Sequence, residues 1–376
     1  MMNWRRVFLL AMVWVWGAAC AGAQEPAPPV VLGYYPSWAS NLPPDKIDFT
    51  RLTHLVHAFV TLHGGGVRVP KNFPSKELTQ AAHAAGVKVL LGLGGADSGA
   101  QLSAVARDPA KEEACVQELA RLVADGGYDG IDVDWEFPRE GDAANVVAFV
   151  ARLREVVRQA NPGALVTMPL PWTDSDGKYF DGARLAPLVD FVMLMTYDAH
   201  GPWKADGQAY CHAGFNAPLR ETGTDKIDGD RYSFAKAVDY WKGKGFAERQ
   251  LVIGLHAFGH GFLVENWGDT PAQPSKHGDI DYRKIPPLIA AGWEQHWDDA
   301  AAVPWLKSPP GLPPELITYD DPRSVELKGA WARQAGLRGI FLWEITADLV
   351  DGHNVLVEAG RKGFGLPVPA PQADSK

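Results

Sequence analysis

Eight short apolar runs rich in β-branched residues recur along the chain, and stretches of helical periodicity separate many of them. This alternation is typical of a parallel sheet built from β/α units. The runs are Val30–Tyr35, His54–Val60, Lys88–Gly94, Gly130–Glu136, Leu165–Leu170, Phe191–Tyr197, Leu251–Phe258 and Gly339–Trp343. We expect helices at Ser75–Ala85, Ala110–Asp125, Asn145–Ala160, Phe234–Lys244 and Ser324–Gln334. Eight strands predict an α/β fold closed into a (β/α)8 TIM barrel, for which about 250 residues are typical.

The chain has 376 residues, and most of the surplus lies between the seventh and eighth runs. Residues 259–316 show little helical periodicity but carry Trp267, Tyr282, Trp293, Trp297 and Trp305. A long irregular loop is the alternative, but it would hide these aromatics poorly without a small core of its own. We therefore expect an inserted subdomain within a barrel spanning 24–366, and a disordered tail at 367–376.

The first 23 residues have the pattern of a secretory signal peptide. Two arginines precede an apolar run, and small residues suggest cleavage near Ala23. A membrane anchor is one alternative, but the run is shorter than the roughly 20 apolar residues of a spanning helix. Lipidation at Cys20 is another, but Gly17 stands where an aliphatic residue is usual. The sequence thus predicts a secreted or periplasmic protein without a membrane span, which we expect to be a monomer.

The formal net charge is −9, from 36 basic and 45 acidic residues. This balance argues against nucleic acid as a partner and favours a neutral or cationic substrate. Cleavage would leave two cysteines, Cys115 and Cys211, which an exported protein could oxidise to a disulfide or keep as buried thiols.

Residues 128–138 carry three acids that alternate with apolar side chains. Asp132, Asp134 and Glu136 would share one face of a strand at a spacing of about 6.6 Å. In a parallel barrel the apolar face must meet the helices, so the acids point inward, with Glu136 at the carboxyl end where barrel enzymes keep their active sites. Crowded, buried carboxyls cannot all ionise, so at least one pKa should rise toward neutrality, as a general acid requires.

Two other interpretations of this segment stay open. A solvated acidic turn would not need the regular alternation with apolar residues. A divalent-metal site fits oxygen ligands, although metal ligands usually converge from several strands. His256 and His260 could also bind a metal, but no third ligand is apparent. We expect neither a metal nor a cofactor.

The segment Asp129-Gly-Ile-Asp132-Val-Asp134-Trp-Glu136 resembles the signature of family 18 glycoside hydrolases, the chitinase-like enzymes. The resemblance extends over nearly the whole mature chain. Segments similar to the family's strand motifs are Gly33–Trp38, His57–Phe59, Leu91–Gly95, Met195–Asp198 and Leu342–Glu344. Gly214–Leu219 and Ile317–Ser324 are similar to segments of members with an α+β insertion between strand 7 and helix 7, which implies that residues 259–316 are a shortened insertion of this kind.

The resemblance implies a retaining glycosidase in which the substrate's own acetamido group attacks the sugar. Glu136 would protonate the glycosidic oxygen and later activate water. Asp134 would accept a hydrogen bond from the acetamido N–H, and Asp132 would share a proton along the row. Tyr197 would bind the acetamido oxygen, unless it is a core tyrosine, and Trp343 would form the apolar floor under the sugar.

Further substrate contacts are expected around this centre. They are Asp198, Met195, Tyr34, Trp172 and Trp203. Trp38 and Trp267 are additional candidate sugar platforms, for which plain packing is the alternative. The likeness also predicts a non-proline cis peptide bond at Trp343-Glu344.

Two positions depart from the family pattern. Gly92 stands where the family usually has a serine whose hydroxyl stabilises charge at Asp132, so only Tyr34 is expected to do so here. The seventh run ends at His256–His260, where insertion-bearing members usually have an aromatic-glycine-arginine sequence. Substrate contacts on that side are therefore in question.

The leading prediction is a secreted glycosidase that hydrolyses β-1,4-linked N-acetylglucosamine polymers or oligomers, chitin or its fragments. Within the family, an endo-β-N-acetylglucosaminidase or a peptidoglycan-directed hydrolase is the alternative. A catalytically weak chitin-binding lectin is another, although such relatives typically lack the acid that Glu136 supplies. A metal-dependent barrel enzyme is the third class.

Overall fold

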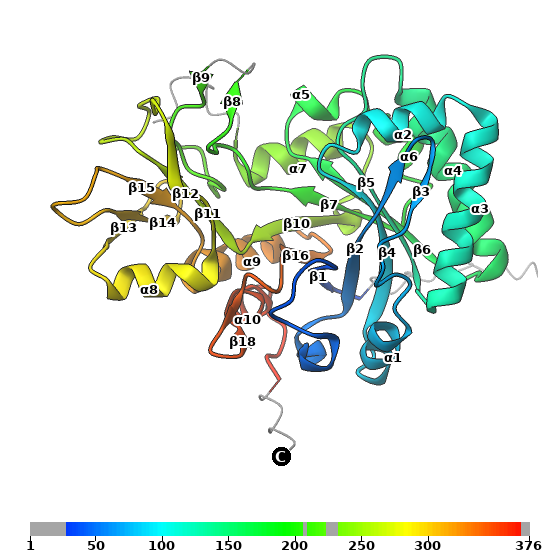
Figure 1. The fold of residues 1–376 in the computed structure, drawn as a ribbon, viewed down its shortest axis with the longest axis horizontal. Coiled ribbons are helices and arrows are strands. Elements are labelled where there is room, and N and C mark those ends of the chain that lie inside the picture. The colour runs from blue at the N-terminus through cyan, green and yellow to red at the C-terminus, as the bar shows by residue number, and fades with distance from the viewer. Residues whose placement is uncertain (1–27, 206–208, 223–231, 370–376) are drawn as a thin grey trace, which may run out of the picture.

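The computed structural model describes residues 28–205, 209–222 and 232–369, so the predicted signal peptide and the end of the predicted tail lie outside the described residues. Eight parallel strands run in the order β1-β16-β10-β7-β6-β5-β4-β2, and β1 also pairs with β2, which closes the barrel (Figure 1). The strands are β1 Val30–Pro36, β2 His54–His63, β4 Lys88–Gly95, β5 Gly130–Trp135, β6 Leu165–Pro171, β7 Phe191–Met195, β10 Leu251–His256 and β16 Gly339–Trp343. The prediction of a TIM barrel is confirmed.

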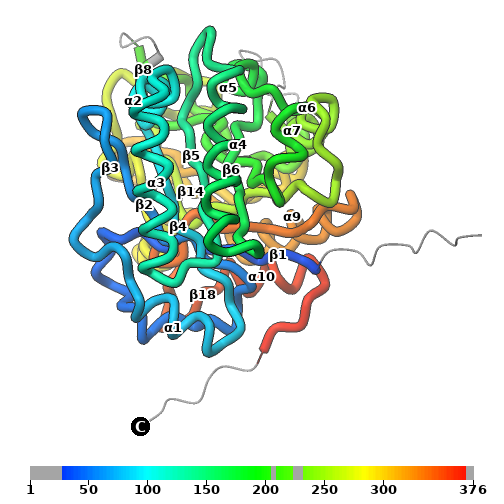
Figure 2. Tube along the Cα trace, turned by 90° about the vertical axis from the view of Figure 1, so that its right-hand side faces the viewer, coloured from blue at the N-terminus to red at the C-terminus, as the bar shows by residue number. Residues whose placement is uncertain are grey.

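Helices cover the outside of the barrel, and α3 and α4 lie side by side along it (Figure 2). The helices are α1 Lys76–Ala84, α2 Gly99–Ala106, α3 Pro109–Gly126, α4 Ala143–Ala160, α5 Asp174–Gly177, α6 Gly182–Leu185, α7 Phe234–Gly243, α9 Pro322–Gln334 and α10 Val355–Gly363. All five predicted helices are present. The ends of α3 follow from local chemistry: the Asp108 side chain caps its first turn, and Gly127 ends it with a φ of 69°.

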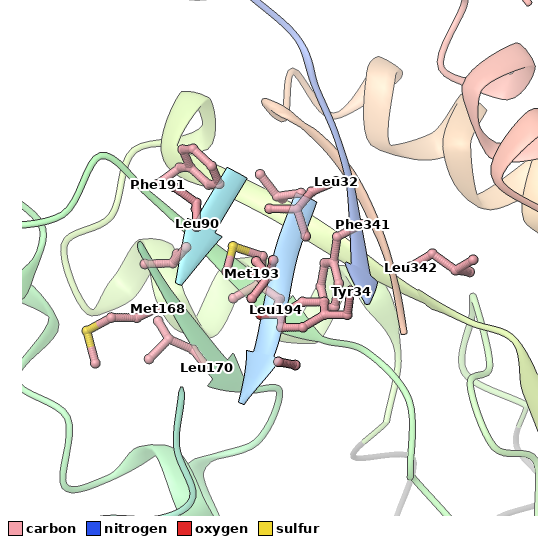
Figure 3. Packing of buried hydrophobic residues seen from close by; sticks show 14 of the residues in the cluster. Leu32, Tyr34, Leu90, Met168, Leu170, Phe191, Met193, Leu194, Phe341 and Leu342 are labelled. Atoms are coloured by element: carbon pink, nitrogen blue, oxygen red, sulfur yellow. The ribbon is translucent and has the colours of Figure 1, made fainter. Parts of the chain in front are cut away.

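Apolar side chains fill the barrel interior below Asp132, Asp134 and Glu136, which we call the acidic row. Leu32, Phe191, Met193 and Phe341 pack between the strands (Figure 3). Because the outer faces of the strands are buried under helices as well, the strands are apolar on both faces. Cys115 is a buried free thiol on α3, so it forms no disulfide with Cys211.

An insertion follows β10 and lies at one side of the barrel (Figure 1). Its five-stranded sheet has the order β12-β11-β15-β14-β13. The elements are β11 Phe258–Phe262, β12 Pro274–Asp281, α8 Ile285–Ala290, β13 Glu294–Asp298, β14 Val303–Lys307 and β15 Leu316–Thr318. Short strands elsewhere are β3 Gly66–Arg68, β8 Lys204–Ala205, β9 Ala209–Tyr210, β17 Leu349–Val350 and β18 His353–Asn354.

The five aromatics of the insertion are divided among hydrophobic clusters. Trp267 and Trp305 pack against two small separate clusters, whereas Tyr282, Trp293 and Trp297 belong to or pack against the large cluster, which contains apolar residues of both the insertion and the barrel. The insertion is thus anchored to the barrel through shared apolar surface. Within the described ranges, no helix has the length and apolar character needed to cross a membrane.

A buried ion pair joins the segment just after β15, the last strand of the insertion, to helix α9. Lys328 Nζ on α9 lies 2.6 and 2.5 Å from the two carboxylate oxygens of Asp320, and both side chains are fully buried. Ser324 donates a further hydrogen bond to Asp320, and His256 Nε2 lies 3.1 Å from the same carboxylate. Breaking such a pair leaves an uncompensated buried charge.

Replacing Lys328 by Met is therefore expected to lower the free energy of unfolding by about 3–5 kcal/mol at pH 7. Denaturant titration followed by circular dichroism measures this change. The matched control is Lys362→Met, which breaks the exposed pair with Glu326 and should cost about 1 kcal/mol or less. Equal small losses in both variants would contradict the assignment of Lys328 as a buried charge partner.

Candidate active site

The acidic row of β5 points into the barrel, as the alternation predicted. Asp132 and Asp134 are buried on this strand, and Glu136 follows its last residue. Trp135, between the two outer acids, faces the other way and packs edge-on against Phe149 of α4, with ring centroids 5.9 Å apart. The burial of the tryptophan on the helix side fixes the acids on the inner side.

Two hydroxyl groups hold the innermost acid. Tyr34 donates a hydrogen bond of 2.8 Å to Asp132 Oδ2, and Thr167 on β6 donates one of 2.5 Å to Oδ1. Burial raises the pKa of Asp132 to about 7, although both hydrogen bonds act to lower it. The expectation that Tyr34 acts alone is therefore wrong. A threonine in an otherwise apolar strand was the available signal for Thr167.

Gly92 is the register neighbour of Asp132 on β4. A Cβ atom at this position would lie 2.9 Å from the Phe59 ring and 3.0 Å from the His57 carbonyl oxygen. The serine that the family pattern would place here has no room without movement of these neighbours. In this chain the second hydroxyl comes from the opposite neighbouring strand, at Thr167.

The two outer acids share a hydrogen bond, which raises the pKa of Asp134 and lowers that of Glu136. Burial, followed by the charges of Glu136 and Asp132, raises the pKa of Asp134 well above its usual range. Burial raises the pKa of Glu136 to about 7, with smaller contributions from the charges of Asp198, Asp97 and Asp176. The Oδ1 atom of Asp134 is buried without a hydrogen-bond partner. The row therefore holds protons near neutral pH and offers one unused acceptor.

The row opens into a cleft of about 610 Å³ at the carboxyl ends of the strands. Of the predicted site residues, those that line it are Tyr34, Asp134, Glu136, Met195, Tyr197, Asp198 and Trp343. The Trp343 ring stacks on Phe59 at 5.9 Å, and Trp38 follows Phe59 at 6.3 Å, so one wall is a series of aromatic faces. Such faces suit the apolar sides of sugar rings.

Two predicted substrate contacts lie elsewhere. Trp172 is buried against Tyr232, with ring centroids 5.0 Å apart, and does not line the cleft. It follows β6 at a position whose side chain points to the outer face, opposite to the face of Thr167. Trp203 is 42% exposed and meets the His260 ring edge-on outside the cleft lining. Trp267 packs against Phe215, Phe262 and Trp305.

The predicted cis peptide bond at Trp343-Glu344 is present, and Ala58-Phe59 and Glu136-Phe137 are also cis.

The two histidines near the end of β10 have protein partners. His256 Nδ1 lies near the Phe258 carbonyl oxygen and the Asn216 side-chain amide, and His260 contacts the Asp198 carboxylate. Among the residues that the structure describes, no group of three or more potential ligand side chains is arranged to hold a metal ion.

Comparisons with known proteins agree with this geometry. Residues 30–348 match the profile of Glycosyl hydrolases family 18, so the chain belongs to this family. A "chitinase-like effector" of Moniliophthora roreri is 26% identical, covering 90% of this chain and 93% of that protein. A "Probable endochitinase" of Caenorhabditis elegans is 29% identical, covering 70% of this chain and 44% of that protein.

Solved structures show the same architecture. The Group IV chitinase of Ostrinia furnacalis superposes with a TM-score of 0.79 at 25% identity, covering 90% of this chain and all of that one. YKL-39, solved with chitooligosaccharides, has a TM-score of 0.80 at 21% identity and shares the fold. The protein is a glycoside hydrolase.

Removing the hydroxyl of Thr167 should raise the pKa of Asp132 further. We expect Thr167→Val to raise it by about one unit, because the carboxylate loses a hydrogen bond that favours its charged form. Titration of the carboxyl ¹³C signal measures the change. Thr167→Ser should keep the original pKa, as should Thr79→Val, which alters an equally buried threonine on α1. An unchanged pKa in Thr167→Val would contradict the role of this hydroxyl.

Proposed function

We propose that this glycoside hydrolase cleaves β-1,4-linked N-acetylglucosamine polymers or oligomers with retention of the anomer, using the acetamido group of the substrate as nucleophile. The observation that carries the proposal is the inward row of acids, in which Asp134 presents a buried and unpartnered oxygen beside Glu136. A buried acceptor of this kind calls for a donor, and an acetamido N–H would supply it.

Glu136 has the properties of the proton donor. Its pKa of about 7 keeps a large fraction protonated at neutral pH, and it lines the cleft where a glycosidic oxygen would lie. After the leaving group departs, the same carboxylate would accept a proton from the attacking water. Asp134 would orient the acetamido group and stabilise the positive charge of the cyclic intermediate.

The other contacts fit the same pose. Tyr197 lines the cleft, and burial, followed by the charges of the nearby acids, raises the pKa of its hydroxyl well above the usual range, so it remains a donor for the acetamido oxygen. Trp343 would form the floor under the sugar that is cleaved. The similarity to the Group IV chitinase of Ostrinia furnacalis supports a substrate of the chitin type.

The site of action is also part of the proposal. The arginines, apolar run and small residues at the beginning of the chain support export to the periplasm or the outside of the cell. There the enzyme would act as a monomer on chitin or its oligomers.

The decisive variant is Glu136→Gln, which keeps the shape of the side chain and removes the proton donor. We expect kcat on chromogenic N-acetylglucosamine oligosaccharides to fall by about 10²–10⁴-fold. Glu140→Gln, an exposed acid four residues on, is the matched control and should retain full activity. Equal turnover in the wild type and Glu136→Gln would remove the enzyme mechanism and favour a binding protein.

The stereochemistry of the product provides the second test of the mechanism. ¹H NMR of the fresh product should show the β-anomer, because the acetamido group and then water attack from opposite faces of the sugar. An α-anomer would overturn the substrate-assisted step even if Glu136 proves essential.

The pH profile follows from the same group. Because Glu136 must carry a proton to act as the acid, kcat/KM should fall about tenfold per pH unit above roughly pH 7. Asp97→Asn removes a charge that raises this pKa, so the midpoint of the alkaline limb should move down by less than about one unit. Activity that stays constant up to pH 9 would contradict Glu136 as the titrating acid.

A further inference from the structure

His260 lies on β11, where the insertion leaves the barrel, with its side chain only 3% exposed. Its Nε2 is 2.9 Å from Asp198 Oδ1, and its Nδ1 is 3.0 Å from Asp279 Oδ1. Nδ1 also lies 3.3 Å from the Gly278 carbonyl oxygen. Carboxylate and carbonyl oxygens only accept hydrogen bonds, so each ring nitrogen must carry a proton to satisfy its neighbours. The geometry therefore selects the doubly protonated, positively charged ring.

The two carboxylates are the charged groups that face this ring. The other elements packed around it contribute the edge of Trp203, the ring of Phe258 and the carbonyl oxygen of Gly278, all of which are uncharged. Thr318, also uncharged, lies directly across from His260 in the register of β15. Burial by itself would lower the pKa of His260, but the pairs with both acids outweigh it and raise the pKa to about 9.

The two acids belong to different parts of the molecule. Asp198 lines the cleft just beyond β7, where its backbone has a φ of 62° and its N–H donates to Asn216 Oδ1 at 2.6 Å. Asp279 lies on β12 of the insertion with its side chain 81% exposed. His260 thus connects a cleft residue of the barrel to the outer strand of the insertion sheet.

We propose that His260 is a positioning residue for the Asp198 side of the cleft: while it is positively charged it ties Asp198 to Asp279, and sugar binding on that side depends on this tie. A neutral imidazole can donate to only one of the two acids. Loss of the proton therefore leaves one acid hydrogen-bonded to the ring and the other facing a ring lone pair, which breaks the connection between them. This inference rests on the proposed function only for the identity of the sugar.

The direction of the pH effect follows from the raised pKa. The tie is complete below about pH 6.5, the ordinary pKa of histidine, and is lost as the pH rises through about 9. This range lies above the alkaline limb set by Glu136, so turnover is a poor reporter. Binding to a catalytically silent protein separates the two effects.

The experiment measures the Kd of chitotetraose for Glu136→Gln by calorimetry between pH 6 and pH 10. We expect Kd to rise by about threefold to tenfold with a midpoint near pH 9. Adding Asp279→Asn should lower the midpoint by about one unit, because one of the two stabilising charges is removed. Asp281→Asn, on the same strand but paired with Arg283, is the matched control and should not move the midpoint.

His260→Arg tests the positive charge itself, because a guanidinium keeps donors for both acids throughout this pH range. In the Glu136→Gln background, the Kd of His260→Arg for chitotetraose should stay constant to pH 10. His260→Gln in the same background should bind chitotetraose at all pH values as weakly as the Glu136→Gln protein does at pH 10. A merely structural role for His260 would lower the melting temperature of both variants without moving the midpoint in Asp279→Asn.

Direct titration of the His260 ring by ¹⁵N NMR in the wild-type protein provides a readout that needs no sugar and no variant at this position. A ring pKa near 9 supports the proposal, and a ring pKa at or below 6.5 overturns it. Chitotetraose binding that does not change with pH also overturns it while leaving the proposed function intact. Absence of binding at every pH overturns the proposed substrate, and the ring titration then still decides whether the tie exists.

Discussion

The structure depends on keeping three carboxyl groups inside a barrel that is otherwise apolar. Water cannot solvate Asp132 or Asp134, so each negative charge on the row must be balanced by hydrogen-bond donors or removed by a proton. The chain uses both solutions. Two hydroxyl groups stabilise the charged form of the innermost acid, although burial still raises its pKa to about 7, while burial and neighbouring charges raise the pKa of Asp134 well above its usual range. The chemistry of the site is a consequence of this unequal treatment of three similar groups.

The strand alternation made much of this predictable. Side chains on a strand alternate between faces, so a buried tryptophan at Trp135 is enough to place its acidic neighbours inside. The eight strands and five of the helices were predicted for the same reason, because their apolar periodicity is strong. The other five α-helices of the described residues were missed. Helices α5, α6 and α8 have only four to six residues, α2 is short and rich in small residues, and α10 contains two glycines.

Contacts between distant segments were harder to predict. Thr167 meets Asp132 only because β5 and β6 are adjacent in a particular register, and no property of either strand alone fixes that register. Trp172 was assigned to the cleft from its place near a strand end, but the parity of β6 directs it outward. The pairing of His260 with two acids likewise depends on how the insertion folds back on the barrel, which sequence periodicity does not record.

Much of the apolar interior of the insertion is continuous with the core of the barrel, and this limits how the two parts can evolve or be engineered. Tyr282, Trp293 and Trp297 contribute to the same packed interior as the barrel strands. Deletion of the insertion would expose apolar surface of the barrel. The insertion placed on another barrel would carry three large aromatic rings without a complementary surface to pack against. The insertion and the barrel surface that it contacts are therefore expected to change together. Exchanging the insertion between related enzymes requires exchanging both sides of this contact.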